Sequence, residues 1–436
     1  MAAGITVFAA ALAGCASYAP DPLPEKPDST GKAAAQMHER APLDMDAVAT
    51  LAVLNNPDIN AARAQMQVAA AQAFAAGILP EPQMGATTDV PYDRVTSPRD
   101  PRYPEYHAYG FTLGVDVRAL LTHASKRASA DAAYRQAQQE MLWKEWQTIA
   151  EVRTLYVAQS IAEERRALLA PAAEQYALAA ARSQRALARH DVTLEQSGAD
   201  EAALAVIQTQ LGGASRDALK AESSLRALLG LAPDEPVALR PLGPPAIPDR
   251  AQVAAAAERL PSSRPDLRAL QEGYRSEEAQ LRVAVLSQFP DVVVGFSRAR
   301  DVSDVHTNGG IVSFNLPIFD GARGDIAVQK ATRAGLRAEY QARLDQARAD
   351  IWSLWDEIEQ LRAELAELEA RLPSLEQGAS NSRRGFSAGI FPGASYFIAV
   401  NALLTAQSSR FDLLQTLWDD SIALATVTGT EVRPER

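Results

Sequence analysis

The chain contains two similar halves, and this duplication constrains the fold more than any single residue does. Asn56-Pro57-Asp58-Ile59 returns as Arg264-Pro265-Asp266-Leu267 after about 200 residues. Further along each half, Tyr109-Gly110-Phe111-Thr112-Leu113 is matched by Val312-Ser313-Phe314-Asn315-Leu316. Each half reads as helix, strand, strand, long helix and returning helix. We therefore expect two copies of one unit rather than two or three unrelated globular domains.

The composition narrows the possible classes of protein. The 436 residues are 47% apolar but only 6% aromatic, and alanine dominates many stretches, which suits long helices that pack closely. The formal net charge of −11 argues against a nucleic-acid partner. No stretch of about 18 uncharged apolar residues is present, so no transmembrane helix is expected.

The strand-like segments alternate between two kinds of side chain with a period of two. From His107 to Val117, large apolar residues alternate with small or polar ones, and the same holds for Val292–Ser297 and Val312–Ile318. A small, polar face fits a water-filled lumen, whereas the competing interpretation is two ordinary hairpins over a soluble core. We expect a transmembrane β-barrel. Membrane barrels begin at about eight strands and tolerate no open edge, so chains with four strands must combine.

The segments after the strands are predicted to be long helices. The first runs from Ala119 to about His190 and the second from Gly324 to Ala388. Pro171 and Pro373 recur at matching places, which we interpret as a shared bend. In the second helix, apolar residues spaced alternately by three and four predict a coiled-coil seam. The seam consists of Ile351, Leu354, Ile358, Leu361, Leu365, Leu368, Leu372 and Leu375.

The N-terminal region carries the pattern of a lipoprotein. The single cysteine excludes an intrachain disulfide. Leu12-Ala13-Gly14-Cys15 follows a short apolar run and resembles the lipobox of bacterial lipoproteins, in which the cysteine is acylated. Ala16-Ser17 lacks the aspartate that retains lipoproteins in the inner membrane, so this resemblance implies anchoring in the outer membrane of a Gram-negative bacterium.

These features divide the chain into predicted regions. We interpret them in order as a signal peptide, a lipid anchor with its tether, a first repeat, a proline-rich linker, a second repeat and a tail. Their predicted bounds are 1–14, 15–42, 43–230, 231–261, 262–429 and 430–436.

Taken together, the motifs resemble the TolC-like family of outer-membrane efflux channels. The residues that carry this resemblance are Asn56-Pro57-Asp58, Ser263-Arg264-Pro265-Asp266-Leu267, Leu228-Leu229-Gly230 and the run from Phe314 to Gly324. The resemblance implies a mainly α fold with a transmembrane β-barrel. It also implies a homotrimer with one twelve-stranded barrel above a periplasmic α-helical coiled-coil tunnel. Such a channel is a passive exit duct that works with a periplasmic adaptor and an inner-membrane pump, which supplies the energy.

The resemblance also implies roles for residues at the helix turns. The turns at the periplasmic end of the tunnel would contact the adaptor. They map to His190, Asp191, Val192 and Thr193 in the first half and to Gly389, Ile390, Phe391, Pro392, Gly393 and Ser395 in the second. Acidic residues near a lumen constriction would favour cations, and Asp191, Glu195 and Glu376 are the candidates, with ordinary surface carboxylates as the competing interpretation.

No catalytic, metal or cofactor site is expected. The five histidines are scattered without ligand-like spacing, and no phosphate-binding glycine pattern is present. The alternative to a channel is a periplasmic coiled-coil scaffold lipoprotein without a pore. Within the channel interpretation, Gly77–Gln83 resembles the metal-cation branch, which serves pumps of the resistance-nodulation-division type. Drug-type and type I secretion partners remain open at this point.

Overall fold

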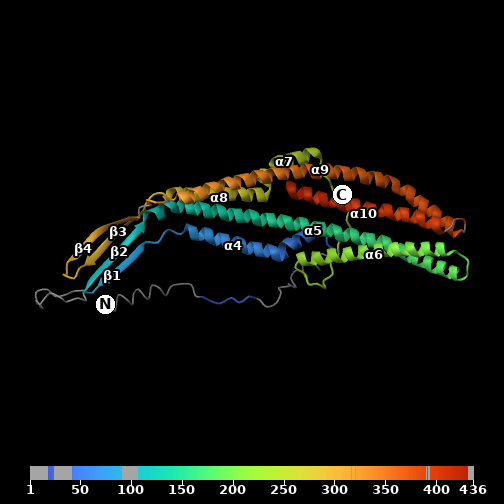
Figure 1. Cartoon of the computed structure of the whole chain (residues 1–436), viewed down its shortest axis with the longest axis horizontal. Helices are drawn as coiled ribbons and strands as arrows, with labels where there is room; N and C mark the ends of the chain where they lie inside the picture. The colour runs from blue at the N-terminus through green and yellow to red at the C-terminus, as the bar shows by residue number, and fades with distance from the viewer. Residues whose placement is uncertain are drawn as a thin grey trace.

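A computed structural model describes residues 18–23, 42–90, 107–315, 317–319, 321–388, 390 and 393–430. The molecule is long and narrow, with a β-sheet at one end and two helical turns at the other (Figure 1). The helices run between these two ends, roughly side by side. Sheet and turns are therefore separated by most of the length of the molecule.

The order of elements confirms the predicted duplication. The first half consists of α3 (Met45–Asn55), α4 (Pro57–Gly77), β1 (Gln83–Asp89), β2 (Ala108–Asp116), α5 (Val117–Ala188) and α6 (Leu194–Leu228). The second half consists of α7 (Arg250–Ser263), α8 (Pro265–Leu286), β3 (Asp291–Arg300), β4 (His306–Asn315), α9 (Arg323–Ser387) and α10 (Gly393–Thr428). Helix α7 takes the place of α3 in the second half and lies largely within the region predicted as the linker.

The rest of that predicted linker packs against the middle of the molecule. Leu43 forms a parallel bridge with Leu239, and its amide donates to the Ala238 carbonyl at 2.9 Å. The Tyr156 hydroxyl of α5 donates to the Arg240 carbonyl at 2.7 Å, and the Trp418 indole donates to the Gly243 carbonyl at 3.0 Å. These bonds hold the proline-rich segment against helices from both halves.

In the first half, the Asn-Pro-Asp motif ties the start of one helix to the end of another. The Asn56 side chain caps α4 by accepting from the Ile59 amide at 3.0 Å, and it donates to the Leu228 carbonyl of α6 at 3.1 Å. Pro57 occupies the first turn of α4, where its missing N–H costs nothing. Gly230 has a φ of +65°, and a Cβ built there would lie 2.9 Å from the Asn55 carbonyl oxygen. The motif and the Leu-Gly helix end are therefore two sides of one contact.

The second half makes the corresponding contact with different chemistry. The Arg264 guanidinium pairs with the Asp266 carboxylate at 2.7 and 3.0 Å, and both side chains are buried. Arg264 also lies over the Trp143 ring at 4.9 Å, which partly compensates the buried charge. Gly429 has a φ of +74°, and a Cβ there would lie 2.8 Å from the Trp146 ring. The two copies of the motif thus occupy equivalent positions in the two halves, each close to the glycine that ends the returning helix.

The long helices match their predicted extents. Helix α5 has 72 residues and α9 has 65, so each spans about 100 Å at 1.5 Å per residue. Pro171 and Pro373 lie inside continuous helices, and Figure 1 shows α9 following a curved path. All eight residues of the predicted seam in α9 are buried or half-buried, while the charged residues beside them are exposed, which confirms the seam.

The two helical turns share one way of ending a helix. The Asp191 amide donates to the Ala186 carbonyl at 2.9 Å, and the Ile390 amide donates to the Gly385 carbonyl at 2.8 Å. These six-to-one bonds are those of a Schellman motif. His190 has a φ of +62°, the left-handed conformation that glycine normally supplies. The first turn therefore needs no glycine, although its sequence departs from that of the second. Thr193 and Gln196 then form a capping box at the start of α6.

No helix among the described residues is long and apolar enough to cross a membrane.

We predict that Gly230→Ala destabilises the protein. A left-handed conformation costs a residue with a Cβ about 1–2 kcal/mol, and the close Asn55 carbonyl adds to this cost. Gly243→Ala is the matched control, because a Cβ there meets nothing within 4 Å. We expect the midpoint of thermal unfolding, followed by circular dichroism in detergent, to fall for Gly230→Ala only. Equal midpoints for the two variants would contradict the contact described above.

Candidate functional site

The sheet has four antiparallel strands in the order β1-β2-β3-β4, so hairpins from both halves form one surface. Residues directly opposite each other in an antiparallel pair point to the same face. The register joins Met84 to Leu113 and Leu113 to Phe296, which places these three side chains on one face. The next level on that face holds Val115, Val294 and Val312. We call this the apolar face.

The apolar face is open to its surroundings in the single chain. Val312 is 64% exposed, Phe314 is 58% exposed and Phe296 is 50% exposed. Exposure of so many large apolar side chains on one sheet marks a surface that meets lipid or another protein. The predicted alternation is thus confirmed.

The opposite face carries small and polar residues, and we call it the small-residue face. One of its levels joins Gly85, Thr112, Ser297 and Gly309, and the next joins Thr87, Gly110, Ala299 and Thr307. A Cβ on Gly110 would lie only 2.6 Å from the Thr87 hydroxyl oxygen. Threonine side chains therefore cover the neighbouring glycines at these two levels, while the two levels nearer the helices also include Ile311 and Val293.

Both edges of this sheet are free within the described residues. Strand β1 pairs only with β2, and β4 pairs only with β3. Each edge presents unpaired backbone N–H and C=O groups, which readily accept a strand from another chain.

The far end of the molecule holds the predicted contact residues at the helical turns. His190, Asp191 and Thr193 are exposed and Val192 is half-buried in the first turn. In the second turn Ile390 is 72% exposed, Ser395 is exposed and Gly393 is half-buried. Gly389, Phe391 and Pro392 lie outside the described residues, as does Cys15.

A groove of about 780 Å³ runs between the two helical hairpins near these turns. Val192, Thr193 and Gly393 line it, so the structure brings residues of both predicted turns to one surface. Two exposed arginines, Arg182 and Arg383, also line it. We call this surface the tip groove.

Aromatic side chains join the two hairpins beside the tip groove. The rings of Phe386 and Tyr396 stack at 5.3 Å, and Tyr176 of α5 contacts Phe397 of α10 at 4.7 Å. The Tyr176 hydroxyl donates to the Asn401 side chain at 2.7 Å. Burial raises the pKa of Tyr176 to about 12, so this hydroxyl stays protonated. These residues were not among the predicted contact residues, although the four aromatics at positions 386, 391, 396 and 397 are conspicuous in a chain with 6% aromatics.

The three constriction candidates do not form one cluster in the single chain. Asp191 and Glu195 lie in the first turn, and Glu195 lines the tip groove. Glu376 lies on α9, about 16 Å along the helix from its end. All three are exposed. Whether they meet around a lumen depends on neighbouring chains, and their role stays a prediction.

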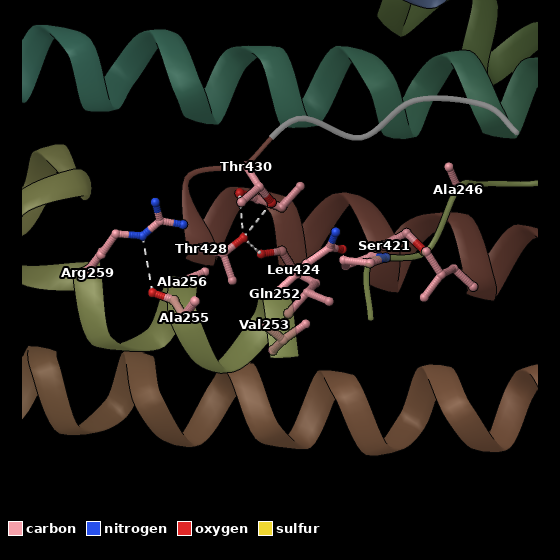
Figure 2. Close-up of a pocket in the computed structure, with 13 residues that line it drawn as sticks. Ala246, Gln252, Val253, Ala255, Ala256, Arg259, Ser421, Leu424, Thr428 and Thr430 are labelled. Atoms are coloured by element: carbon pink, nitrogen blue, oxygen red, sulfur yellow. Dashed lines mark hydrogen bonds between the residues drawn. The ribbon is translucent and has the colours of Figure 1, made fainter. Parts of the chain in front are cut away.

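A separate pocket of about 540 Å³ lies in the middle of the molecule, between α7 and the end of α10 (Figure 2). The Arg259 guanidinium donates to the Ala255 carbonyl at 3.2 Å, and the Thr428 hydroxyl donates to the Leu424 carbonyl at 2.7 Å. Among the described residues, the lining of this pocket contains no histidine, cysteine or carboxylate. Across the part of the chain that the structure describes, no three such residues are grouped to hold a metal ion.

Comparison with known proteins relates the second half of the chain to a described family. Residues 256–430 match the family model described as outer membrane efflux protein. That segment begins in α7 and includes the whole of β3, β4, α9 and α10. No curated protein sequence matches the chain.

Several solved channels share the fold. The outer-membrane channel OprN superimposes with a TM-score of 0.74 at 17% identity, covering 95% of this chain and 99% of that one. The Campylobacter jejuni outer-membrane channel CmeC gives 0.72 at 15% identity over 88% of this chain and 85% of that one. CusC, whose structures concern transmembrane channel formation, gives 0.70 at 15% identity over 89% and 92%. Residues 256–430 of the chain thus carry an outer membrane efflux protein domain, and nearly the whole chain has the fold of these solved outer-membrane channels.

Proposed function

We propose that this protein is the outer-membrane exit duct of a tripartite efflux system, built from three copies of the chain. The observation that carries this proposal is the two-faced sheet with two free edges. In lipid, an unpaired backbone edge has no water to satisfy it, so such a sheet must close. Three copies supply twelve strands, which suffice for a membrane barrel.

The orientation of the strands is compatible with closure between copies. Strands β1 and β4 run antiparallel to each other, because the four strands alternate in direction. The β1 edge of one copy can therefore pair with the β4 edge of the next in an antiparallel ladder. In that arrangement the apolar face points to lipid and the small-residue face to the lumen.

The helical turns are proposed to contact a periplasmic adaptor, which connects the duct to an inner-membrane pump. The tip groove supports this assignment, because it combines apolar, aromatic and basic side chains at the end farthest from the sheet. Arg182 and Arg383 have no ion pair within the described residues and can receive carboxylates of a partner. A resistance-nodulation-division pump is proposed from the resemblance of Gly77–Gln83 to the metal-cation branch, and metal cations are the corresponding cargo.

The duct is proposed to be passive, with no catalysis of its own. The pocket in Figure 2 lacks carboxylates and imidazoles, and cargo would move along the lumen rather than bind there. We also propose that Cys15 carries the lipid, including palmitate, that anchors the chain to the outer membrane.

Cysteine cross-linking tests the closed trimer. Thr87→Cys on β1 is combined in turn with Thr307→Cys, Gly309→Cys, Ile311→Cys or Ser313→Cys on β4, because the stagger between copies is set by the barrel. We expect at least one pair to give covalent dimers and trimers on oxidation, read on denaturing gels. Thr87→Cys with Gly110→Cys is the control, since these residues are opposite within one chain. Closure would be refuted if every β1–β4 pair gave only monomers. It would also be refuted if cross-linked species larger than trimers formed.

A bulky residue at Gly393 should block the adaptor contact. A Cβ there lies 3.4 Å from the Phe386 ring, so Gly393→Leu fills the tip groove. We expect a deletion strain that carries this variant to lose most of its tolerance to metal salts or to antibiotics, while heat-modifiable trimers still form. Gly378→Leu on α9 is the control, because a Cβ there meets nothing within 4 Å. Full tolerance with Gly393→Leu would show that the groove is not the contact surface.

Replacing Cys15 by alanine should abolish acylation without preventing trimer formation. The thiol is the atom that receives the lipid, and Cys15 is far in sequence from the strands that close the barrel. Incorporation of radiolabelled palmitate is measured on immunoprecipitated protein, alongside the trimer band. Label retained in the Cys15→Ala variant contradicts the anchor.

A further inference from the structure

The end of the sheet away from the helices, which we call the loop end, differs from the rest of the apolar face. Strands β2 and β4 lead into α5 and α9 at the other end, and the turn between β3 and β4 lies farthest from the helices (Figure 1). The register places Phe111, Arg298 and Asn308 at one level and Tyr109, Arg300 and His306 at the outermost level. Both levels belong to the apolar face, because each lies an even number of residues from Phe296 along β3.

Arg298 is the uncompensated charge of the loop end. Its side chain is exposed, and it has no ion pair or hydrogen bond among the residues that the structure describes. Arg300, by contrast, pairs with Asp304 at 2.7 Å, and the His306 imidazole lies 3.6 Å from the same carboxylate. One carboxylate therefore serves two basic residues, while Arg298 has none.

The opposite end of the same sheet shows that such a charge can be neutralised within the chain. Arg118, just after β2, pairs with Asp291 at the start of β3. On the apolar face the levels at that end hold Val292 and Phe314, with no basic residue. Among the described residues, unpaired positive charge on the apolar face therefore lies only at the loop end.

This asymmetry has a consequence that depends on the proposed barrel. A charge in the middle of the lipid-facing surface is costly, but near the interface its cost falls almost to zero. A guanidinium at the second level can extend toward the loop end and keep its head in the polar region. Tyr109 lies one level farther out, where aromatic rings with a polar group collect at membrane interfaces.

We propose that Arg298 binds a phosphate group of the glycolipid that forms the outer leaflet, with Tyr109 and His306 beside it. The planar guanidinium can donate two parallel hydrogen bonds to two phosphate oxygens. Reduced hydration at the membrane–water interface strengthens that contact. The loop end faces the outer leaflet, because the helices extend from the other end into the periplasm. The partner is accordingly the phosphorylated glycolipid of that leaflet and not an inner-leaflet phospholipid.

Native mass spectrometry of the delipidated trimer in detergent tests this assignment. The protein is titrated with diphosphorylated lipid A, with the same lipid after removal of its phosphates, and with phosphatidylglycerol. We expect the wild-type protein to retain the diphosphorylated lipid preferentially, and Arg298→Ala to reduce its apparent affinity about tenfold. Arg337→Ala is the matched control, since Arg337 is an exposed arginine on α9, outside the sheet, without an ion pair in the described part of the chain.

The outcomes separate this inference from the function on which it rests. If Arg298→Ala forms normal trimers and binds the diphosphorylated lipid like the wild type, the lipid assignment is wrong and the duct stands. If phosphatidylglycerol binding depends equally on Arg298, the glycolipid assignment is wrong. Failure of the wild-type chain to form trimers in the cross-linking experiment would instead remove the barrel and with it the basis of this proposal.

Discussion

The open edges of a four-stranded sheet are the constraint on which the rest of the structure depends. Edge strands β1 and β4 leave rows of backbone groups unpaired, and one face of the same sheet exposes large apolar residues such as Phe296 and Val312. Water can satisfy the backbone groups but not the apolar face, and lipid can satisfy the face but not the backbone groups. The proposed pairing between copies removes this conflict between the edges and the apolar face. Because β2 runs directly into α5, with Asp116 capping the helix, closing the sheet also sets where the long helices begin.

Because of the duplication, the same kind of contact between helices occurs once in each half. In each half a helix that starts at an X-Pro-Asp motif is held against the glycine that ends the returning helix. The first half uses the Asn56 amide for this. In the second half a Cβ on Gly429 would lie 3.7 Å from Ser263, and the adjacent Arg264–Asp266 pair is buried and stacks on Trp143. Replacing one partner of a buried ion pair leaves an uncompensated charge, which is far more costly than losing an amide hydrogen bond. The two halves are therefore similar in geometry but unequal in their tolerance of substitution.

Periodicity made much of this fold predictable, and long-range pairing made the rest unpredictable. The alternation around Phe111 and the seam from Ile351 depend only on neighbours in sequence, and both are found as expected. Helix α7 was not predicted, because the prolines around it are typical of a linker. Its packing against α9 and α10 in one apolar cluster depends on residues far away in the sequence. The tip groove was missed for a similar reason, since Tyr176 and Phe397 are more than 200 residues apart. His190 shows that a left-handed helix end can lack glycine when the backbone bonds of the turn are formed.

The two hairpins are joined near their turns by one apolar cluster. Leu169 and Tyr176 of α5, Ile207 of α6, and Phe397 and Leu404 of α10 are buried together in it. The Tyr176–Phe397 ring contact and the Tyr176–Asn401 hydrogen bond each add about 1 kcal/mol to the stabilisation from burial. Tyr396 and Phe397 also line the tip groove, so the cluster holds one wall of the groove in place. A partner that binds the tip groove therefore meets a preformed surface, and the entropy cost of ordering that surface is already met by folding.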